Sequence, residues 1–296
     1  MGWVRSVMET KGSLIERINR LAEGGIAPSG KEFRGLSLSA VETISSAMGV
    51  SRRDVEIAAL EEGVIPLRYQ RNIGSVGIEG QVKLRRARVA VVGAGGLGGL
   101  IIELLARLGI GTLVLIDGET FTEDNLNRQI LCAEAGVGRS KVEAARQRVS
   151  EINSAVEVEI HNVFIRRDNI DALIMGCCLV IDALDSIPVR LILQEAAGRL
   201  GVPFVHGAVA GFVGEIMTVC PGDRGLAAFY EGGQHIPRAG IEVELGTPSV
   251  TPAVTAALQA MEAVKLITGR GELIRNKLLY LDLDESRMSE INLARS

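Results

Sequence analysis

Residues 89–117, VAVVGAGGLGGLIIELLARLGIGTLVLID, have the pattern of a buried strand, a glycine-rich turn, an apolar helix and a second strand that ends in an acid. Gly93, Gly95 and Gly98 fall in the pattern G-x-G-x-x-G. The first glycine permits a tight turn, the second lets the backbone approach a phosphate, and the third lets the helix pack on its strand. Asp117 ends the second strand, where an acid binds ribose hydroxyls. The stretch therefore predicts a nucleotide site beside a helix N-terminus, and taken alone it favours NAD.

From residue 88 onward, strand and helix patterns alternate along the chain. This alternation predicts an α/β domain with a doubly wound, Rossmann-like and mostly parallel sheet. The segment 211–223, GFVGEIMTVCPGD, predicts an antiparallel continuation of that sheet. A helix at 251–269 and a strand at 277–284 complete the pattern.

Residues 1–66 differ in character from residues 67–296, because their helical patterns are short and are broken by glycine and proline. Ser39 and Ser51 are each followed three residues later by an acid, as at the start of a helix, so residues 38–63 predict a helix, a turn and a helix. Eight Lys and Arg stand against nine Asp and Glu in residues 1–66, whereas a DNA-binding helix pair carries a basic face. We therefore predict a small helical appendage that serves docking or dimer formation rather than DNA binding.

The bulk composition excludes several classes of protein. A formal net charge of -4 and a pI near 5.6 argue against general affinity for nucleic acid or an anionic membrane. No basic-then-apolar signal begins the chain and no uninterrupted apolar run reaches the length of a membrane span, so a cytoplasmic protein is predicted. The four cysteines, Cys132, Cys177, Cys178 and Cys220, form no C-x-x-C pair, so neither zinc nor a disulfide scaffold is expected.

The loop after Asp117 is unlike that of a dehydrogenase. It places Asn125, Arg128, Gln129 and Lys141 within 24 residues of the ribose acid. Hydride transfer needs no such group of donors, whereas attack on a phosphoanhydride does, because negative charge shifts among the phosphate oxygens. The loop therefore favours ATP over NAD; the alternative is a solvated polar loop.

Asp182 and Asp185 end the apolar strand CLVIDALD, at the edge where open α/β sheets bind ligands. Mg²⁺ is bound in proteins by one or two carboxylates together with substrate phosphates. A carboxylate here predicts a magnesium site, although Asp185 could instead cap the helix that follows at Pro188.

Several motifs in order resemble one known family. They are RYQRN (68–72), GIEGQVKL (77–84), VVGAGGLGG, LIDGETFTEDNLNRQ, VGRSK, VIDALDSIPVR and LQAMEAVKLITGRGELI. Together they closely resemble the ThiF/MoeB/HesA adenylyltransferases, relatives of the ubiquitin-activating enzymes, over residues 67–284.

The resemblance implies roles for individual residues. Gly93, Gly95, Gly96 and Asp117 would contact ATP, Asn125, Arg128, Gln129 and Lys141 would line its phosphates, and Asp185 would bind Mg²⁺. Arg71 would reach the ATP of a neighbouring subunit, which implies a homodimer with shared sites. The substrate would be a small ubiquitin-like sulfur-carrier protein of the thiamine or molybdopterin type, ending in Gly-Gly. Its terminal carboxylate would attack the α-phosphate and release pyrophosphate. A carboxylate is already anionic, so the reaction needs positioning and charge neutralisation but no general base.

Three features of the sequence depart from the family. The paired cysteines that hold zinc in many relatives are absent, Glu242 falls near the place of a reactive cysteine, and Ser186 replaces the usual asparagine after Asp185. These departures favour adenylation over sulfur relay, with Cys220 the nearest candidate nucleophile. Alternatives are activation of another acceptor, as in tRNA-modifying dehydratases or peptide-adenylating enzymes, a non-catalytic scaffold, and an NAD-dependent dehydrogenase.

Overall fold

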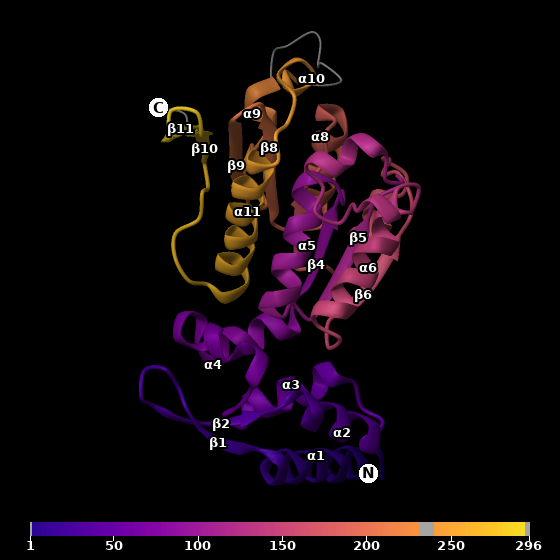
Figure 1. Ribbon diagram of the computed structural model, residues 1–296, viewed down its shortest axis with the longest axis vertical. Helices are drawn as coiled ribbons and strands as arrows, with labels where there is room; N and C mark the ends of the chain where they lie inside the picture. Colours follow the sequence, from indigo (N-terminus) through magenta and orange to yellow (C-terminus); the bar gives the residue numbers. More distant parts are fainter. Residues whose placement is uncertain (1, 231–239, 294–296) are drawn as a thin grey trace.

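The computed structural model of the chain describes residues 2–230 and 240–293. Its centre is an eight-stranded sheet of order β11-β10-β9-β8-β7-β4-β5-β6 (Figure 1). The strands are β4 (Arg88–Val92), β5 (Thr112–Ile116), β6 (Glu157–His161), β7 (Leu179–Asp182), β8 (Phe204–Ala210), β9 (Val213–Val219), β10 (Lys277–Asp282) and β11 (Arg287–Asn292). Strands β4 to β8 pair in parallel, and β9, β10 and β11 continue antiparallel. The predicted fold is confirmed; β11 is an additional strand.

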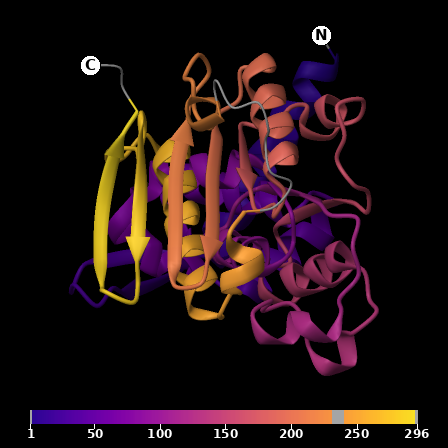
Figure 2. The same cartoon turned by 90° about the horizontal axis from the view of Figure 1, so that it is seen from above.

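Helices cover both faces of this sheet (Figure 2). One apolar cluster contains residues of α5 (Gly96–Leu108), α6 (Lys141–Ile152) and α11 (Val250–Thr268), together with Leu84. The other contains residues of α7 (Ile170–Ile174) and α8 (Ile187–Arg199). Successive side chains of a strand point to opposite faces, so Val89 and Val91 join the first cluster while Ala90 and Val92 join the second. This double burial explains why β4 is apolar throughout.

Helix α11 is a long, largely apolar helix that is packed inside the protein. It contains 18 residues with a mean hydropathy of 1.2, which by length and composition alone would allow it to cross a membrane. Half of that window is buried inside the protein. The buried carboxylate of Glu262 accepts hydrogen bonds from the Thr218 hydroxyl at 2.6 Å and from the Ile274 backbone N–H at 2.8 Å. The helix is thus fixed to β9 and to the segment before β10, as a core helix is.

The N-terminal module is more than the helical appendage expected. Its elements are α1 (Gly2–Leu21), β1 (Glu23–Ile26), β2 (Glu32–Leu36), α2 (Leu38–Met48), α3 (Arg52–Glu61) and β3 (Val64–Pro66), with the strands in one sheet. Ser51 caps α3 as predicted, but Ser37 rather than Ser39 caps α2. Leu14, Ile18 and Val55 belong to a separate buried cluster of the module.

The module docks at the amino ends of the strands, away from α10 (Glu242–Leu245) (Figure 1). The Arg53 guanidinium donates to the Thr112 hydroxyl at 3.0 Å and to the Glu157 carboxylate at 2.7 Å, at the starts of β5 and β6. Between module and sheet lie the short helix η1 (Leu67–Tyr69) and α4 (Gln70–Arg86). Helix α4 kinks at Gly77, whose φ is 74°. Short helices elsewhere are η2 (Glu123–Asn127), η3 (Glu134–Gly136) and α9 (Ala227–Tyr230).

Candidate active site

A cavity of about 1220 Å³ opens at the carboxyl ends of β4, β5 and β7. Of the residues predicted for the site, those that line it are Gly93, Gly95, Gly96, Asp117, Asn125, Arg128, Gln129, Lys141 and Asp185. Open α/β sheets bind ligands at this edge because the loops there diverge to opposite faces. The fold therefore brings together nearly all of the site residues that the sequence suggests.

The glycine turn is held by close backbone packing. Gly93 has a φ of 97°, and a Cβ there would lie 2.8 Å from the carbonyl carbon of Ala183, after β7. A Cβ on Gly98 would lie 2.7 Å from the carbonyl carbon of Gly93, so α5 can approach the turn only without a side chain at this position. Gly95 is the N-cap of α5 and has no side chain to accept hydrogen bonds from the first N–H groups of the helix. These N–H groups are therefore suited to binding phosphate.

We expect Gly98→Ala to lower the free energy of unfolding by roughly 3 kcal/mol, because the added methyl group overlaps backbone that cannot move independently. Gly96→Ala is the matched control, since its Cβ would come no closer than 3.6 Å to another residue. Urea unfolding followed by circular dichroism measures both variants. Equal unfolding midpoints for the two would show that close packing at Gly98 does not constrain the turn.

Asp117 is fixed between two loops. One carboxylate oxygen accepts the Ala94 N–H at 2.8 Å and the other accepts the Glu119 N–H at 2.8 Å. Burial raises the pKa of Asp117, and these N–H groups together with the charge of Lys141 offset the effect only in part. The acid therefore lies at the junction of the glycine turn and the loop after β5, as a ribose-binding group must.

An apolar wall stands next to Asp117. It is formed by Val163, Phe164, Ile165 and Leu184, which all line the cavity. Gly118 is in close contact with this wall, because a Cβ there would lie 2.8 Å from the Phe164 backbone nitrogen. This part of the cavity suits a flat base.

The polar lining of the cavity includes Arg128, Gln129 and Lys141. The Arg128 side chain lies over Gly96, and its guanidinium donates to the Asp124 carbonyl at 3.0 Å and to the Asn127 side chain at 2.7 Å. The buried Oε1 of Gln129 has no hydrogen-bond partner among the described residues. Buried Lys141 pairs with Glu119, with 2.6 Å between Nζ and Oε2. Glu119 is a site residue that the sequence analysis missed, although it stands only two positions after Asp117.

Asp185 differs from the other acids of the cavity. Five acids line it, and within the described part of the chain Asp185 alone makes no hydrogen bond or ion pair; the others are Asp117, Glu119, Asp124 and Glu242. The N-cap of α8 is Ser186, so the alternative capping role of Asp185 is not observed. A carboxylate that lines the cavity and has no partner among the described residues fits Mg²⁺, which takes one or two carboxylates plus phosphate oxygens.

Asp182, which the sequence places beside Asp185, is fully buried and does not line the cavity. Its carboxylate accepts the Leu184 N–H at 3.0 Å and pairs with His206 Nδ1 at 2.7 Å. Arg190, which lines the cavity, donates from Nε to the Leu184 carbonyl at 3.1 Å. These three side chains hold the turn that carries Asp185.

His206 is the basic partner in this buried group. Burial opposes its charged form, but hydrogen bonds to Asp182 and Glu215 outweigh burial, so the pKa of His206 is raised. Arg190 acts in the opposite direction. Arg190 could have been identified from its place in the motif VIDALDSIPVR, whereas no sequence signal marks His206.

Three predicted features lie elsewhere or differ. Arg71 is exposed, does not line the cavity and has no hydrogen bond or ion pair with any described residue. Glu242 does line the cavity, and its carboxylate accepts the Gly240 N–H at 2.8 Å. No cysteine is among the lining residues described, and burial raises the pKa of the Cys220 thiol. The cavity therefore offers positioning and charge, without a thiol nucleophile among the residues described.

Solved structures share this fold. MccB of E. coli with MccA-N7isoASN superposes with a TM-score of 0.68 at 23% identity, covering 86% of this chain and 83% of that one. PaaA superposes with a TM-score of 0.64 at 24% identity, covering 77% of this chain and 82% of that one. These similarities show the architecture alone.

Sequence relatives are closer. The SAMP-activating enzyme E1 of Haloferax volcanii is 35% identical over 220 residues, 73% of this chain and 80% of that protein. The sulfur carrier protein adenylyltransferase of Thermus thermophilus is 32% identical over 237 residues, 77% of this chain and 88% of that protein. This chain matches only 62% of the probable adenylyltransferase/sulfurtransferase MoeZ of Mycobacterium tuberculosis, at 32% identity and over 83% of its own length. The sequence pattern of the ThiF family matches residues 69–296. The chain therefore belongs to the ThiF family and is an adenylyltransferase of the ThiF/MoeB type.

Proposed function

We propose that the protein adenylates the C-terminal glycine carboxylate of a small ubiquitin-like sulfur-carrier protein, using ATP and Mg²⁺ and releasing pyrophosphate. The observation that carries the proposal is that Arg128, Gln129 and Lys141 line the same cavity as Asp185, which has no partner among the described residues. Gln129 lies beside Gly95 of the glycine turn and Arg128 beside Gly96. The names of relatives from Haloferax volcanii and Thermus thermophilus support a carrier substrate. A carrier of the thiamine or molybdopterin type is the finer part of the proposal.

The chemistry follows from the side chains present. A carboxylate oxygen of the carrier attacks the α-phosphorus of ATP, a new P–O bond forms, and the bond from that phosphorus to the bridging oxygen breaks as pyrophosphate leaves. Arg128 and Lys141 stabilise the charge that shifts onto the phosphate oxygens, and the N-terminus of α5 binds them. Asp185 would hold Mg²⁺, which when bound neutralises part of the phosphate charge. Asp117 and the wall at Val163–Ile165 orient the nucleoside.

The proposed active form is a homodimer. Arg71 belongs to the motif RYQRN but lies on α4, outside the cavity of its own chain. An exposed arginine with no partner among the described residues is suited to an incoming phosphate. We propose that Arg71 binds the ATP phosphates of the neighbouring subunit, so each site takes Asp185 from one chain and Arg71 from the other.

The test is exchange of labelled pyrophosphate into ATP. We expect exchange only when Mg²⁺ and a small carrier ending in Gly-Gly, encoded near this gene, are both present. The same carrier without its last glycine is the control, since it lacks the attacking carboxylate at the right distance. If exchange occurs without a carrier and a short peptide stimulates it, that result would support peptide adenylation instead. If no carrier of the host supports exchange, the proposal is refuted.

A further inference from the structure

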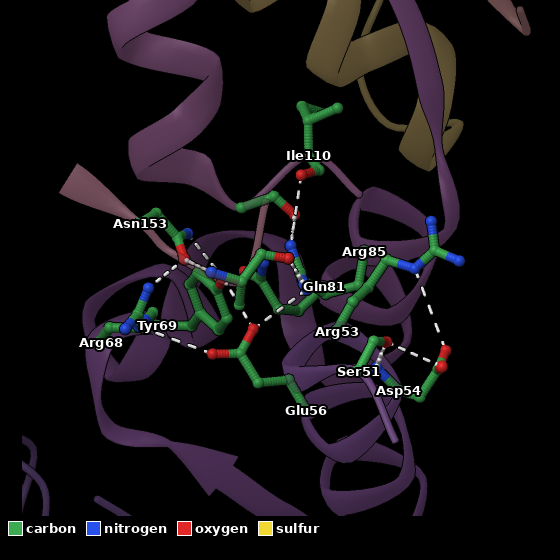
Figure 3. Close-up of polar contacts among 12 residues, drawn as sticks. Ser51, Arg53, Asp54, Glu56, Arg68, Tyr69, Gln81, Arg85, Ile110 and Asn153 are labelled. Carbon is green, nitrogen blue, oxygen red and sulfur yellow. Dashed lines mark hydrogen bonds and ion pairs between the residues drawn. The ribbon is translucent and has the colours of Figure 1, made fainter. Parts of the chain in front are cut away.

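A group of buried charged and polar side chains joins the N-terminal module to the start of α4 (Figure 3). Glu56 of α3 and Arg85 of α4 are both completely buried. One oxygen of Glu56 accepts the Tyr69 hydroxyl at 3.0 Å and lies 3.1 Å from Arg85 Nε, while the other lies 3.5 Å from Arg68 Nε. A buried carboxylate is tolerated only with such partners, so Glu56 ties α3 to η1.

The nucleotide-binding domain holds the same residues from the other side. Asn153, the C-cap of α6, donates from Nδ2 to the Tyr69 hydroxyl at 2.9 Å and to the Ala106 carbonyl at 3.0 Å (Figure 3). Its side-chain oxygen accepts a hydrogen bond from Arg68. Arg85 donates to the Ala155 carbonyl at 2.7 Å. Tyr69 is thus fixed between the module and the domain.

Arg71 follows Tyr69 by two residues, and Asn72, the residue after Arg71, is also held by hydrogen bonds. Asn72 donates to the Gln81 side chain at 3.0 Å, and Gln81 donates to the Leu108 carbonyl at 2.8 Å. Arg71 itself is exposed and has no partner among the described residues. Tyr69 and Asn72, on either side of Arg71 in the chain, are therefore each held by hydrogen bonds, while Arg71 has no partner among the described residues.

We infer that Glu56 is a positioning residue for Arg71, so that the N-terminal module helps to build the ATP site of the neighbouring subunit. The inference rests on the proposed shared-site homodimer. Among the residues described, Glu56 is the module side chain that makes hydrogen bonds or ion pairs with this buried group, and it binds the two residues that precede the first turn of α4. The direction of an arginine at a helix start follows the direction of that turn, and a shift of about 1 Å costs up to ~100-fold in rate.

The alternative is that Glu56 only docks the module. The docking contacts of Arg53 with Thr112 and Glu157 provide a matched control, because they join α3 to β5 and β6 without touching η1 or α4. Arg53→Gln weakens docking and is expected to leave pyrophosphate exchange unchanged. Glu56→Gln is expected to lower exchange by about 10- to 100-fold. Tyr69→Phe, which removes only the hydroxyl between Glu56 and Asn153, serves as the second variant.

The decisive experiment uses mixed dimers purified through two different tags. In the trans arrangement one chain carries Glu56→Gln and the other carries Asp185→Ala. The Glu56→Gln chain keeps its own Asp185 and receives a well-placed Arg71, so about half of the wild-type rate is expected because one of the two sites is complete. In the cis arrangement one chain carries both changes and its partner is wild type. The intact site then receives a displaced Arg71, and the rate falls to the level of the Glu56→Gln homodimer or below.

If Glu56 only stabilises its own chain, the opposite result is expected, with a low rate in trans and about half of the wild-type rate in cis. The working site then lies in the Glu56→Gln chain in trans and in the wild-type chain in cis. That result, or exchange at the wild-type rate in the Glu56→Gln homodimer, would overturn the inference. If Glu56→Gln does not fold, Tyr69→Phe is tested in the same two arrangements with the same outcomes. Mixed dimers of Arg71→Ala with Asp185→Ala are the reference. If they do not restore exchange, the shared-site homodimer is refuted. If they restore exchange but the trans dimers of Glu56→Gln with Asp185→Ala do not, only the inference about Glu56 is refuted.

Discussion

Asp185→Ala is expected to lower carrier-dependent pyrophosphate exchange by about 100- to 1000-fold, the loss typical when one electrostatic group of an active site is removed. Asp185 is the acid of the cavity that no other described side chain or backbone group engages. The remaining four acids already bind backbone N–H groups, hydroxyl groups or Lys141, so among the described acids of the cavity Asp185 alone has both carboxylate oxygens without a partner. The rate is measured over a range of Mg²⁺ concentrations, and excess Mg²⁺ is not expected to restore it.

Two controls separate loss of chemistry from loss of fold. Binding of AMP, which carries the base and ribose but no pyrophosphate, is expected to be unchanged in Asp185→Ala because Asp117 and the apolar wall remain. Asp168→Ala removes an exposed acid that pairs with Arg166 outside the cavity, and it is expected to exchange at the wild-type rate. Exchange by Asp185→Ala within about threefold of wild type would contradict the role assigned to this carboxylate.

The core of the site was predictable because its signals are local. Gly93 has the positive φ that the glycine turn needs, Gly98 packs against Gly93 within that turn, and Asp117 directly follows the next strand. Lys141 comes at the start of a helix whose pattern is clear in sequence. The rule that parallel strands share one carboxyl edge then places these residues together.

Other features depend on contacts that sequence patterns do not encode. Asp182 and Asp185 look equivalent in the sequence. Asp182, the last residue of β7, points into the core and pairs with His206, and only Asp185 lines the cavity. Strands β1 and β2 were missed because they are short and rich in glycine and charge, so they lack the apolar alternation of a strand. Glu56 looks like one more charge on a surface helix, and it is buried only because Arg68, Arg85 and Tyr69 surround it in the fold.

Arg71→Ala is expected to lower exchange by about 100-fold, almost as much as Asp185→Ala. This loss is expected although Arg71 lies outside the cavity of its own chain. Mixed dimers test the geometry directly. When one chain carries Arg71→Ala and the other Asp185→Ala, the first chain supplies Asp185 to its own site and the second supplies Arg71 to it. One complete site remains, so about half of the wild-type rate is expected from two chains that are inactive as homodimers.

The matched control pairs Asp185→Ala with Arg128→Ala. Both residues line the cavity of the same chain, so each site in the mixed dimer lacks one of them and no activity is expected. If the Arg71→Ala pair restores exchange and the Arg128→Ala pair does not, Arg71 belongs to the site of the opposite subunit. Only residues that different chains contribute to one site can complement each other in a mixed dimer. If neither pair restores exchange, Arg71 acts within its own chain, and the first turn of α4 must then move from the position it holds between Tyr69 and Asn72. That outcome would leave adenylation intact as a function and remove the shared site.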